Sequence, residues 1–108
     1  MPEQMSVVVT TSDQVEVLNT IAQSVVEEKL AACCQISGPI QSHYRWQGKT
    51  ESAQEWKCEI KTFASLFDPL SKRITELHNY DVPEIIALNV THVHEPYRTW
   101  ASGQTNSD

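Results

Sequence analysis

The 108-residue sequence has little positive charge and no long hydrophobic run. Its 8 Lys and Arg residues stand against 14 Asp and Glu residues, which gives a formal net charge of −6. Nucleic acids and anionic membrane surfaces bind clustered cationic side chains, so we expect neither partner. No hydrophobic run approaches the roughly 20 residues of a membrane span. The N-terminus lacks the basic-then-apolar pattern of a secretory signal, and we therefore expect a cytoplasmic protein.

Cysteine is also scarce, with Cys33, Cys34 and Cys58 in the whole chain. An odd number with two neighbours is a poor disulfide framework and favours a reducing compartment. No pair has the CxxC spacing of a zinc or redox motif. Because adjacent residues on a strand point to opposite faces, we expect one of Cys33 and Cys34 to be buried and the other to be reachable. Burial without chemistry is the commoner fate of a free cysteine.

Glycine occurs only three times, and no glycine-rich phosphate loop is present, so a nucleotide ligand or other organic cofactor is not favoured. The hydrophobic pattern instead predicts a single α+β domain over residues 1–108. We expect strands at 6–11, 31–46, 52–62 and 84–90, helices at about 15–30, 65–77 and 95–100, and flexible ends at about 1–5 and 102–108. Ser12 or Asp13 is expected to cap the first helix. A bulge is expected at Gly38-Pro39, and a hairpin turn at 47–50.

The order of these elements is that of the ferredoxin-like (split βαβ) fold, an antiparallel sheet with two helices on one face. The other face would be uncovered in a monomer, and the three tryptophans with Tyr44 and Tyr97 would expose a large aromatic area. We therefore expect self-association. The alternating charged row of Glu55, Lys57 and Glu59 is expected to be solvated and to form cross-strand ion pairs. Lys61 follows at the strand end, where a site role is more plausible.

A compact polar segment, residues 78–84, precedes the last strand. It carries His78, Tyr80, two carboxylates and Pro83, which stiffens the chain. Stiff polar loops often hold binding sites, but Tyr80 closing the core edge beside a helix-ending His78 is an equal alternative.

Four ordered motifs resemble those of the CutA divalent-cation tolerance family. They are residues 29–33 (KLAAC), 44–49 (YRWQGK), 59–62 (EIKT) and 78–84 (HNYDVPE), and the resemblance extends from about Ser6 to Trp100. It implies a ferredoxin-like protomer with a long hairpin, a homotrimer similar in architecture to the PII signalling proteins, and a role in tolerance of copper and other divalent metals. Two positions depart from the family pattern: Asn79 replaces the proline of His-Pro-Tyr, and Thr10-Thr11 stand where some bacterial members have a cysteine.

The resemblance assigns a polar cluster whose most plausible metal ligands here are His78 and Glu84, with Cys33 as a further candidate. His92 and His94 form a second candidate pair, because side chains at i and i+2 on a strand share a face. Imidazole and carboxylate ligands suit Cu(II) or Zn(II). The alternatives are a hydrogen-bond network at His78 and a solvated loop at His92 and His94.

A different class of function is a small-molecule sensor with a ligand cleft between subunits. Its lining would include Lys61, Tyr80, Tyr44, Trp46 and Trp100. An enzyme using His78 and Glu84 for acid–base chemistry ranks last, because no nucleophile or hydrolase motif accompanies them. We expect binding rather than catalysis.

Overall fold

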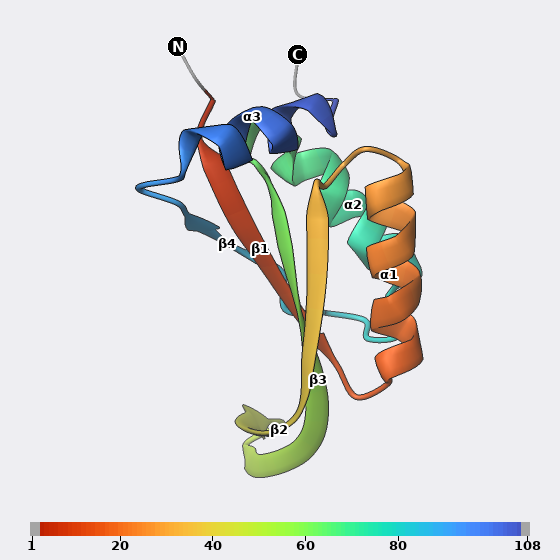
Figure 1. Cartoon of the computed structure of the whole chain (residues 1–108). Coiled ribbons are helices and arrows are strands. Elements are labelled where there is room, and N and C mark those ends of the chain that lie inside the picture. The colour runs from red at the N-terminus through yellow and green to blue at the C-terminus, as the bar shows by residue number, and fades with distance from the viewer. Residues whose placement is uncertain (1–2, 107–108) are drawn as a thin grey trace.

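The computed structural model describes residues 3–106. Along the chain the elements are β1 (Met5–Ser12), α1 (Val15–Glu27), β2 (Cys33–Trp46), β3 (Lys49–Phe63), the 3-10 turn η1 (Ala64–Leu66), α2 (Phe67–Leu77), β4 (Ile86–Asn89) and α3 (Glu95–Gly103). The strands form one antiparallel sheet in the order β2-β3-β1-β4. This is the ferredoxin-like arrangement that the sequence predicts (Figure 1).

The main core lies between the sheet and the two longer helices. Residues of even number on β1 and β3 point to this side, because neighbouring side chains on a strand alternate between faces. The buried residues of this core are Val8, Leu18, Ile21, Val25, Ala31, Cys58, Ile60, Leu70 and Ile74. The three- and four-residue spacing along α1 and α2 places their apolar side chains on the sheet.

The predicted cap of α1 is wrong. The residue before the helix is Gln14, and no side chain caps the helix. Ser12 Oγ instead accepts a hydrogen bond from Gln14 N at 3.0 Å and donates to Asn79 Oδ1 at 2.7 Å. Ser12 thus connects the end of β1 to the loop after α2, and α1 begins at Val15, as the apolar spacing predicts.

The hairpin of β2 and β3 contains the expected bulge, which changes the face on which the later β2 residues lie. Before it, Ser37 pairs with Lys57, and after it Ile40 pairs with Glu55, so β2 advances three residues against two. This shift by one residue brings Tyr44 and Trp46 to the same face as Glu55. The hairpin closes through Gln47 and Gly48, which both have positive φ.

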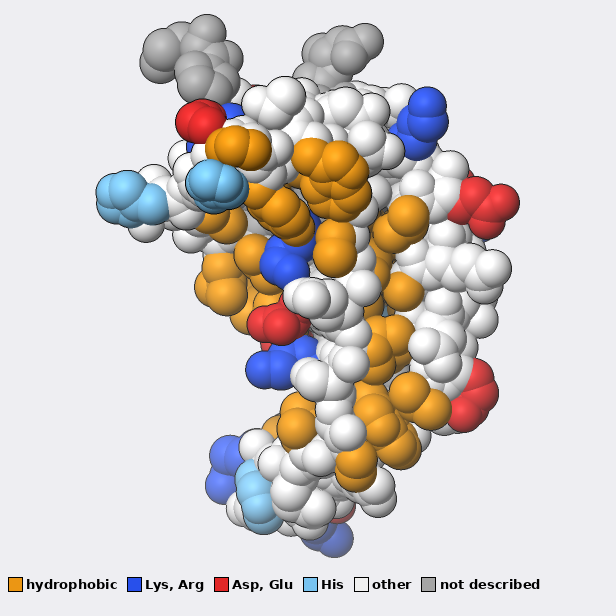
Figure 2. Space-filling model, in the orientation of Figure 1, with side chains coloured by type: hydrophobic (Ala, Val, Ile, Leu, Met, Phe, Trp, Pro, Cys, Tyr) orange, Lys and Arg blue, Asp and Glu red, His pale blue; other side chains and the backbone are white. Residues whose placement is uncertain are grey.

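The opposite face of the sheet is covered at one end only. There α3 lies across the sheet and closes a second cluster of Met5, Ala32, Phe63 and Ala101 (Figure 1). Further along the face, Ile86 and Leu88 of β4 remain 47% and 54% exposed. Figure 2 shows hydrophobic side chains at the surface over α3, the sheet and the base of the hairpin.

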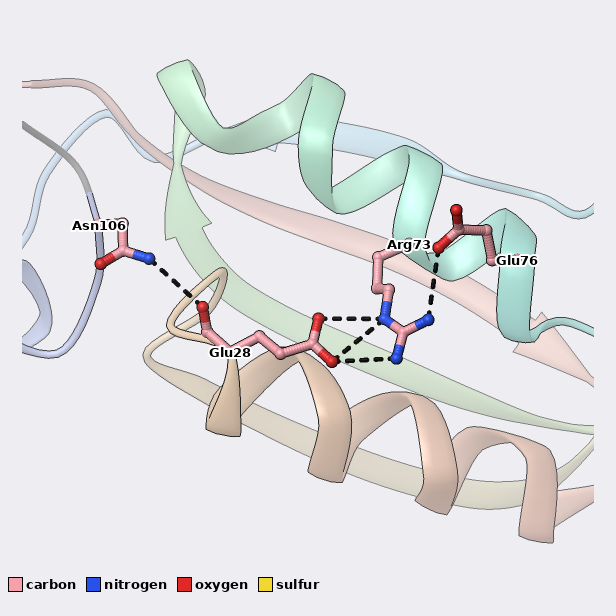
Figure 3. Close-up of polar contacts among 4 residues, drawn as sticks. All are labelled: Glu28, Arg73, Glu76 and Asn106. Atoms are coloured by element: carbon pink, nitrogen blue, oxygen red, sulfur yellow. Dashed lines mark hydrogen bonds and ion pairs between the residues drawn. The ribbon is translucent and has the colours of Figure 1, made fainter.

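Much of the expected flexible ends is ordered structure. Met5 is 2% exposed, and Ser102 and Gly103 belong to α3. Asn106 N donates to Lys29 O at 3.0 Å. The Asn106 amide also reaches the Glu28 carbonyl at 3.4 Å, at the end of α1 where the Glu28 carboxylate binds Arg73 of α2 (Figure 3). Residues 1–2 and 107–108 of the predicted ends lie outside the described residues.

The predicted ion pairs along β3 are wrong. Lys57 lies opposite Ser37 and Thr11, and Glu59 lies opposite Gln35 and Val9, so the register gives neither a charged neighbour. Glu55, expected on a solvated face, is only 8% exposed. The alternation along β3 correctly predicted that Glu55, Lys57 and Glu59 share a face. It did not predict which side chains pack against that face.

Candidate functional site

A groove of about 410 Å³ lies on the open face of the sheet, where the long hairpin leaves the body of the molecule. Its lining combines aromatic rings, carboxylates and two smaller side chains: Thr11, Tyr44, Trp46, Glu55, Tyr80, Asp81, Val82 and Glu84. They come from the end of β1, from both hairpin strands and from the loop before β4. The volume falls within the range of small-molecule sites.

Tyr80 holds the wall of the groove together. Its hydroxyl donates to Glu55 Oε2 at 2.7 Å and accepts a hydrogen bond from Asp13 N at 2.9 Å. Burial, followed by the hydrogen bond to Glu55, raises the pKa of the Tyr80 phenol above its ordinary value. Tyr80 therefore stays protonated at neutral pH and donates a hydrogen bond that fixes the Glu55 carboxylate.

His78 lies behind this wall rather than in the groove lining. Its Nε2 lies 2.8 Å from Thr11 O, and its Nδ1 accepts a hydrogen bond from Tyr80 N at 3.0 Å. Because Nδ1 is an acceptor, the bond to the Thr11 carbonyl assigns the proton to Nε2. Both ring nitrogens are thus engaged within the chain, and a metal could bind His78 only after one of these bonds broke.

The groove is strongly acidic. Glu55, Asp81 and Glu84 contribute carboxylates, and no Lys, Arg or His belongs to the lining. Such a surface attracts cations, and its aromatic rings can also stabilise an organic cation. The carboxylates do not converge on one point, since no group of three or more His, Cys, Asp or Glu in residues 3–106 could hold a metal ion.

Several predicted site residues lie at the other end of the sheet within this chain. Lys61 is six residues from Glu55 on β3, roughly 20 Å at the usual rise per residue. It pairs with Cys33 and donates to the Gln35 side chain. Trp100 lies in α3, where its ring is 5.5 Å from that of Tyr97. This chain therefore brings Tyr44, Trp46, Tyr80 and Glu84 together, but not Lys61, Trp100 or Cys33.

The assumption that His92 and His94 lie on a strand is wrong. β4 ends at Asn89, and His94 immediately precedes α3. His92 Nδ1 lies 3.2 Å from the hydroxyl of its neighbour Thr91. The alternation that would place both rings on one face does not apply to this loop.

Four groove residues were not predicted from the sequence: Thr11, Glu55, Asp81 and Val82. Glu55 was assigned to the solvent because it continues a charged alternation, whereas its hydrogen-bond partner, the Tyr80 hydroxyl, lies 25 residues further along the chain. Asp81 was noted as a carboxylate in the polar loop, without a site role. The signal available in the sequence was the pair Tyr44 and Trp46, which follow the bulge on β2 and mark this face of the hairpin as a site.

No helix in the described part of the chain is long and apolar enough to cross a membrane. The model of the family described as CutA1 divalent ion tolerance protein matches residues 6–104. "Divalent-cation tolerance protein CutA" of Thermus thermophilus is 41% identical over 99 residues, covering 92% of this chain and 96% of that protein.

"Protein CutA, chloroplastic" of Arabidopsis thaliana is 44% identical over 87 residues, which are 81% of this chain. The match spans 48% of the Arabidopsis protein, about half its length. The crystal structure of CutA1 from Oryza sativa has a TM-score of 0.94 at 36% identity, covering 99% of this chain and 98% of that one. The match over nearly the whole sequence and the shared fold agree, and this chain belongs to the CutA1 divalent ion tolerance protein family.

Proposed function

We propose that this protein contributes to divalent-cation tolerance as a homotrimer, by binding the cation rather than by catalysis. The observation that carries the proposal is the groove with three carboxylates and no cationic side chain in its lining. The names of its relatives, which refer to tolerance of divalent cations, support this reading. Because the carboxylates of one chain do not converge, the ion would keep water ligands or take a further ligand from a neighbouring subunit.

The donor chemistry of the groove favours ions that prefer oxygen. Carboxylate and water ligands suit Mg²⁺, Ca²⁺ and Mn²⁺, whereas imidazole suits Cu(II) and Zn(II). Because both nitrogens of His78 are engaged, its proposed role is to position Tyr80. Of the predicted ligands His78, Glu84 and Cys33, we keep only Glu84 as a ligand in the groove. Copper binding by His92 and His94 remains a prediction. No hydrogen bond ties either ring to a helix or strand among residues 3–106.

The test is calorimetric titration of the reduced protein with Mn²⁺ and, separately, with Cu(II). We expect the double variant Asp81→Asn/Glu84→Gln to weaken Mn²⁺ binding at least ~10-fold, as expected when charged ligands are lost. The control Glu51→Gln/Glu59→Gln removes the same charge outside the groove lining and should bind as the parent does. Equal losses in both variants would show attraction by net charge alone and would contradict a site in the groove.

The Cu(II) titration compares His78→Ala with His92→Ala/His94→Ala. A loss confined to the His92/His94 variant would locate copper on that loop. A loss confined to His78→Ala would show that His78 gives up one of its hydrogen bonds to the ion, against the positioning role proposed here.

A small-molecule sensor is the second candidate, supported by the three aromatic rings and the volume of the groove. A ligand in the groove would contact Trp46, which is 58% exposed. A screen by tryptophan fluorescence, repeated on Trp46→Phe, separates this function from cation binding.

Location of the protein in the cytoplasm is a further proposal, tested by fractionation of cells that produce it.

A further inference from the structure

Two of the three thiols lie together on the helix-facing side of the sheet. Cys34 pairs with Ile60 and Cys58 pairs with Ile36, so the cysteines are diagonal neighbours on adjacent antiparallel strands. Cys58 is fully buried, and the partly exposed Cys34 packs against the same core cluster. Solvent therefore reaches one member of the pair. Cys33, between Lys61 and Tyr97, lies on the opposite face.

The interaction between the two thiols shifts their pKa values in opposite directions. The hydrogen bond from Cys34 lowers the pKa of Cys58, while the same bond followed by burial raises the pKa of Cys34. A diagonal pair is poorly spaced for a disulfide, since diagonal Cα atoms are about 7–8 Å apart.

A buried hydroxyl group, that of Thr10, lies on the same face of the sheet as the two cysteines and has no evident structural role. Thr10 is fully buried directly opposite Cys58 in the register of β1 and β3. Its Oγ1 has no hydrogen-bond partner in the described part of the chain. A buried hydroxyl without a partner is destabilising, so it calls for an explanation. Beside a thiolate, it can donate a hydrogen bond to the sulfur.

We propose that Cys34 and Cys58 bind one soft, two-coordinate metal ion of the Cu(I) class, with the Thr10 hydroxyl donating to the Cys58 sulfur. Thiolate ligands select such ions over the hard divalent cations that suit the groove. On binding, two S–M bonds form and both thiol protons leave to solvent, so that M⁺ and two thiols give a complex of charge −1 and two protons. The metal keeps its oxidation state throughout.

This site is separate from the carboxylate groove in residues and in ion class. Cys34 and Cys58 face the helices, whereas Glu55, Asp81 and Glu84 line the opposite side of the sheet. A failure of one proposal therefore leaves the other intact. The variant Asp81→Asn/Glu84→Gln should bind Cu(I) as the parent does.

The test is anaerobic titration of the reduced full-length protein with Cu(I) in competition with bicinchoninate, a chromophoric Cu(I) chelator. We expect one Cu(I) per chain and a thiolate-to-copper absorption band in the ultraviolet. Cys34→Ser should weaken binding at least ~100-fold, and Cys33→Ser, which alters the neighbouring residue on the other face, should stay near the parent. Loss of binding in Cys33→Ser, or parent-like binding by Cys34→Ser, would overturn the proposal.

Thr10→Val tests the hydroxyl without removing a ligand. The parent stoichiometry should be retained with ~10-fold weaker binding, as for other groups that support a metal ligand. An affinity equal to that of the parent would refute the role of Thr10. Because Cys58 is in the core, Cys58→Ala can disturb the fold. Its Cu(I) affinity is compared with that of the parent only if the near-ultraviolet circular dichroism spectra match. If they differ, Cys34→Ser alone tests the proposal.

Discussion

At the residue scale, Tyr80 joins three parts of the chain through one phenol. Its hydroxyl binds Glu55 on β3 and the backbone of Asp13 between β1 and α1, while its own backbone amide binds His78. Glu55 is 8% exposed and has no ion-pair partner in residues 3–106. A buried carboxylate is tolerated when such hydrogen bonds replace its water.

Tyr80→Phe should lower the free energy of unfolding by about 1–3 kcal/mol, because it leaves both the Glu55 carboxylate and the Asp13 amide without this partner. Tyr44→Phe is the matched control on the same groove, since Tyr44 is 45% exposed, and should change stability by less than about 0.5 kcal/mol. Denaturant unfolding at one fixed protein concentration measures both. Equal stability of the two variants would refute the structural role of the phenol.

The raised pKa of Tyr80 predicts a loss of stability in alkali. In the unfolded chain the phenol loses its proton near pH 10, whereas in the folded protein it keeps it. Above about pH 10 the unfolded state binds fewer protons, so the contribution of Tyr80 is full below that pH and falls as the pH rises toward the folded pKa. The parent should lose stability more steeply than Tyr80→Phe between about pH 10 and 11.5. Parallel curves would contradict this prediction.

At the scale of elements, the bulge in β2 determines what the groove contains. Without its extra residue, Tyr44 and Trp46 would point to the face opposite Glu55. Gly38 makes the bulge possible: its φ is +140°, and an added Cβ would lie 2.7 Å from Trp56 Cδ1 and 3.1 Å from Trp56 Cα. The backbone of β3 cannot retreat from such a contact as a flexible side chain could.

Gly38→Ala should therefore destabilise the protein by about 1–3 kcal/mol and displace the hairpin. Tryptophan emission and Mn²⁺ binding should change with it, because the hairpin supplies Trp46 and Glu55 to the groove. Gly103→Ala is the control, since its added Cβ meets nothing within 4 Å. A Gly38→Ala protein with parent stability and parent groove binding would show that the bulge tolerates a side chain.

At the scale of the whole molecule, the shape argues for association. The protein extends 46 Å along its longest axis and only 25 and 22 Å along the others, as the hairpin projects past the helices (Figure 1). On the open face of the sheet, the exposed Ile86 and Leu88 lie next to the half-buried Val7, which pairs with Leu88. Apolar surface in a contiguous patch of this kind is typical of interfaces.

Leu88→Glu should weaken the proposed trimer, because it would place an unpaired carboxylate in the face that association would bury. We expect dissociation at protein concentrations at least ~10-fold higher than for the parent, measured by analytical ultracentrifugation. Val26→Glu introduces the same charge at an exposed apolar residue of α1, 40% exposed, and should leave the assembly unchanged. If both variants sediment as the parent does, the open face is not the interface.

Local sequence patterns were enough to predict the elements and their order. The β-branched run of β1, the apolar spacing along α1 and α2, and the alternation along β3 are local patterns, and strand order follows from them with few alternatives. The sequence also indicated the polar loop with Tyr80 and Glu84, and the bulge at Gly38. These features depend on neighbours a few residues apart, which is the range over which backbone geometry and amphipathic spacing act.

The hydrogen-bond partners of the polar groups, in contrast, depend on contacts between distant segments of the chain. Burial of Glu55 depends on Tyr80, 25 residues away, and engagement of His78 depends on Thr11, 67 residues away. Residues 102–108 were expected to be flexible because they are small and polar, but Asn106 is held by Lys29 and Glu28. Hydrogen bonds and burial between distant segments leave no periodic trace in the sequence, because they are set by how the packed layers meet.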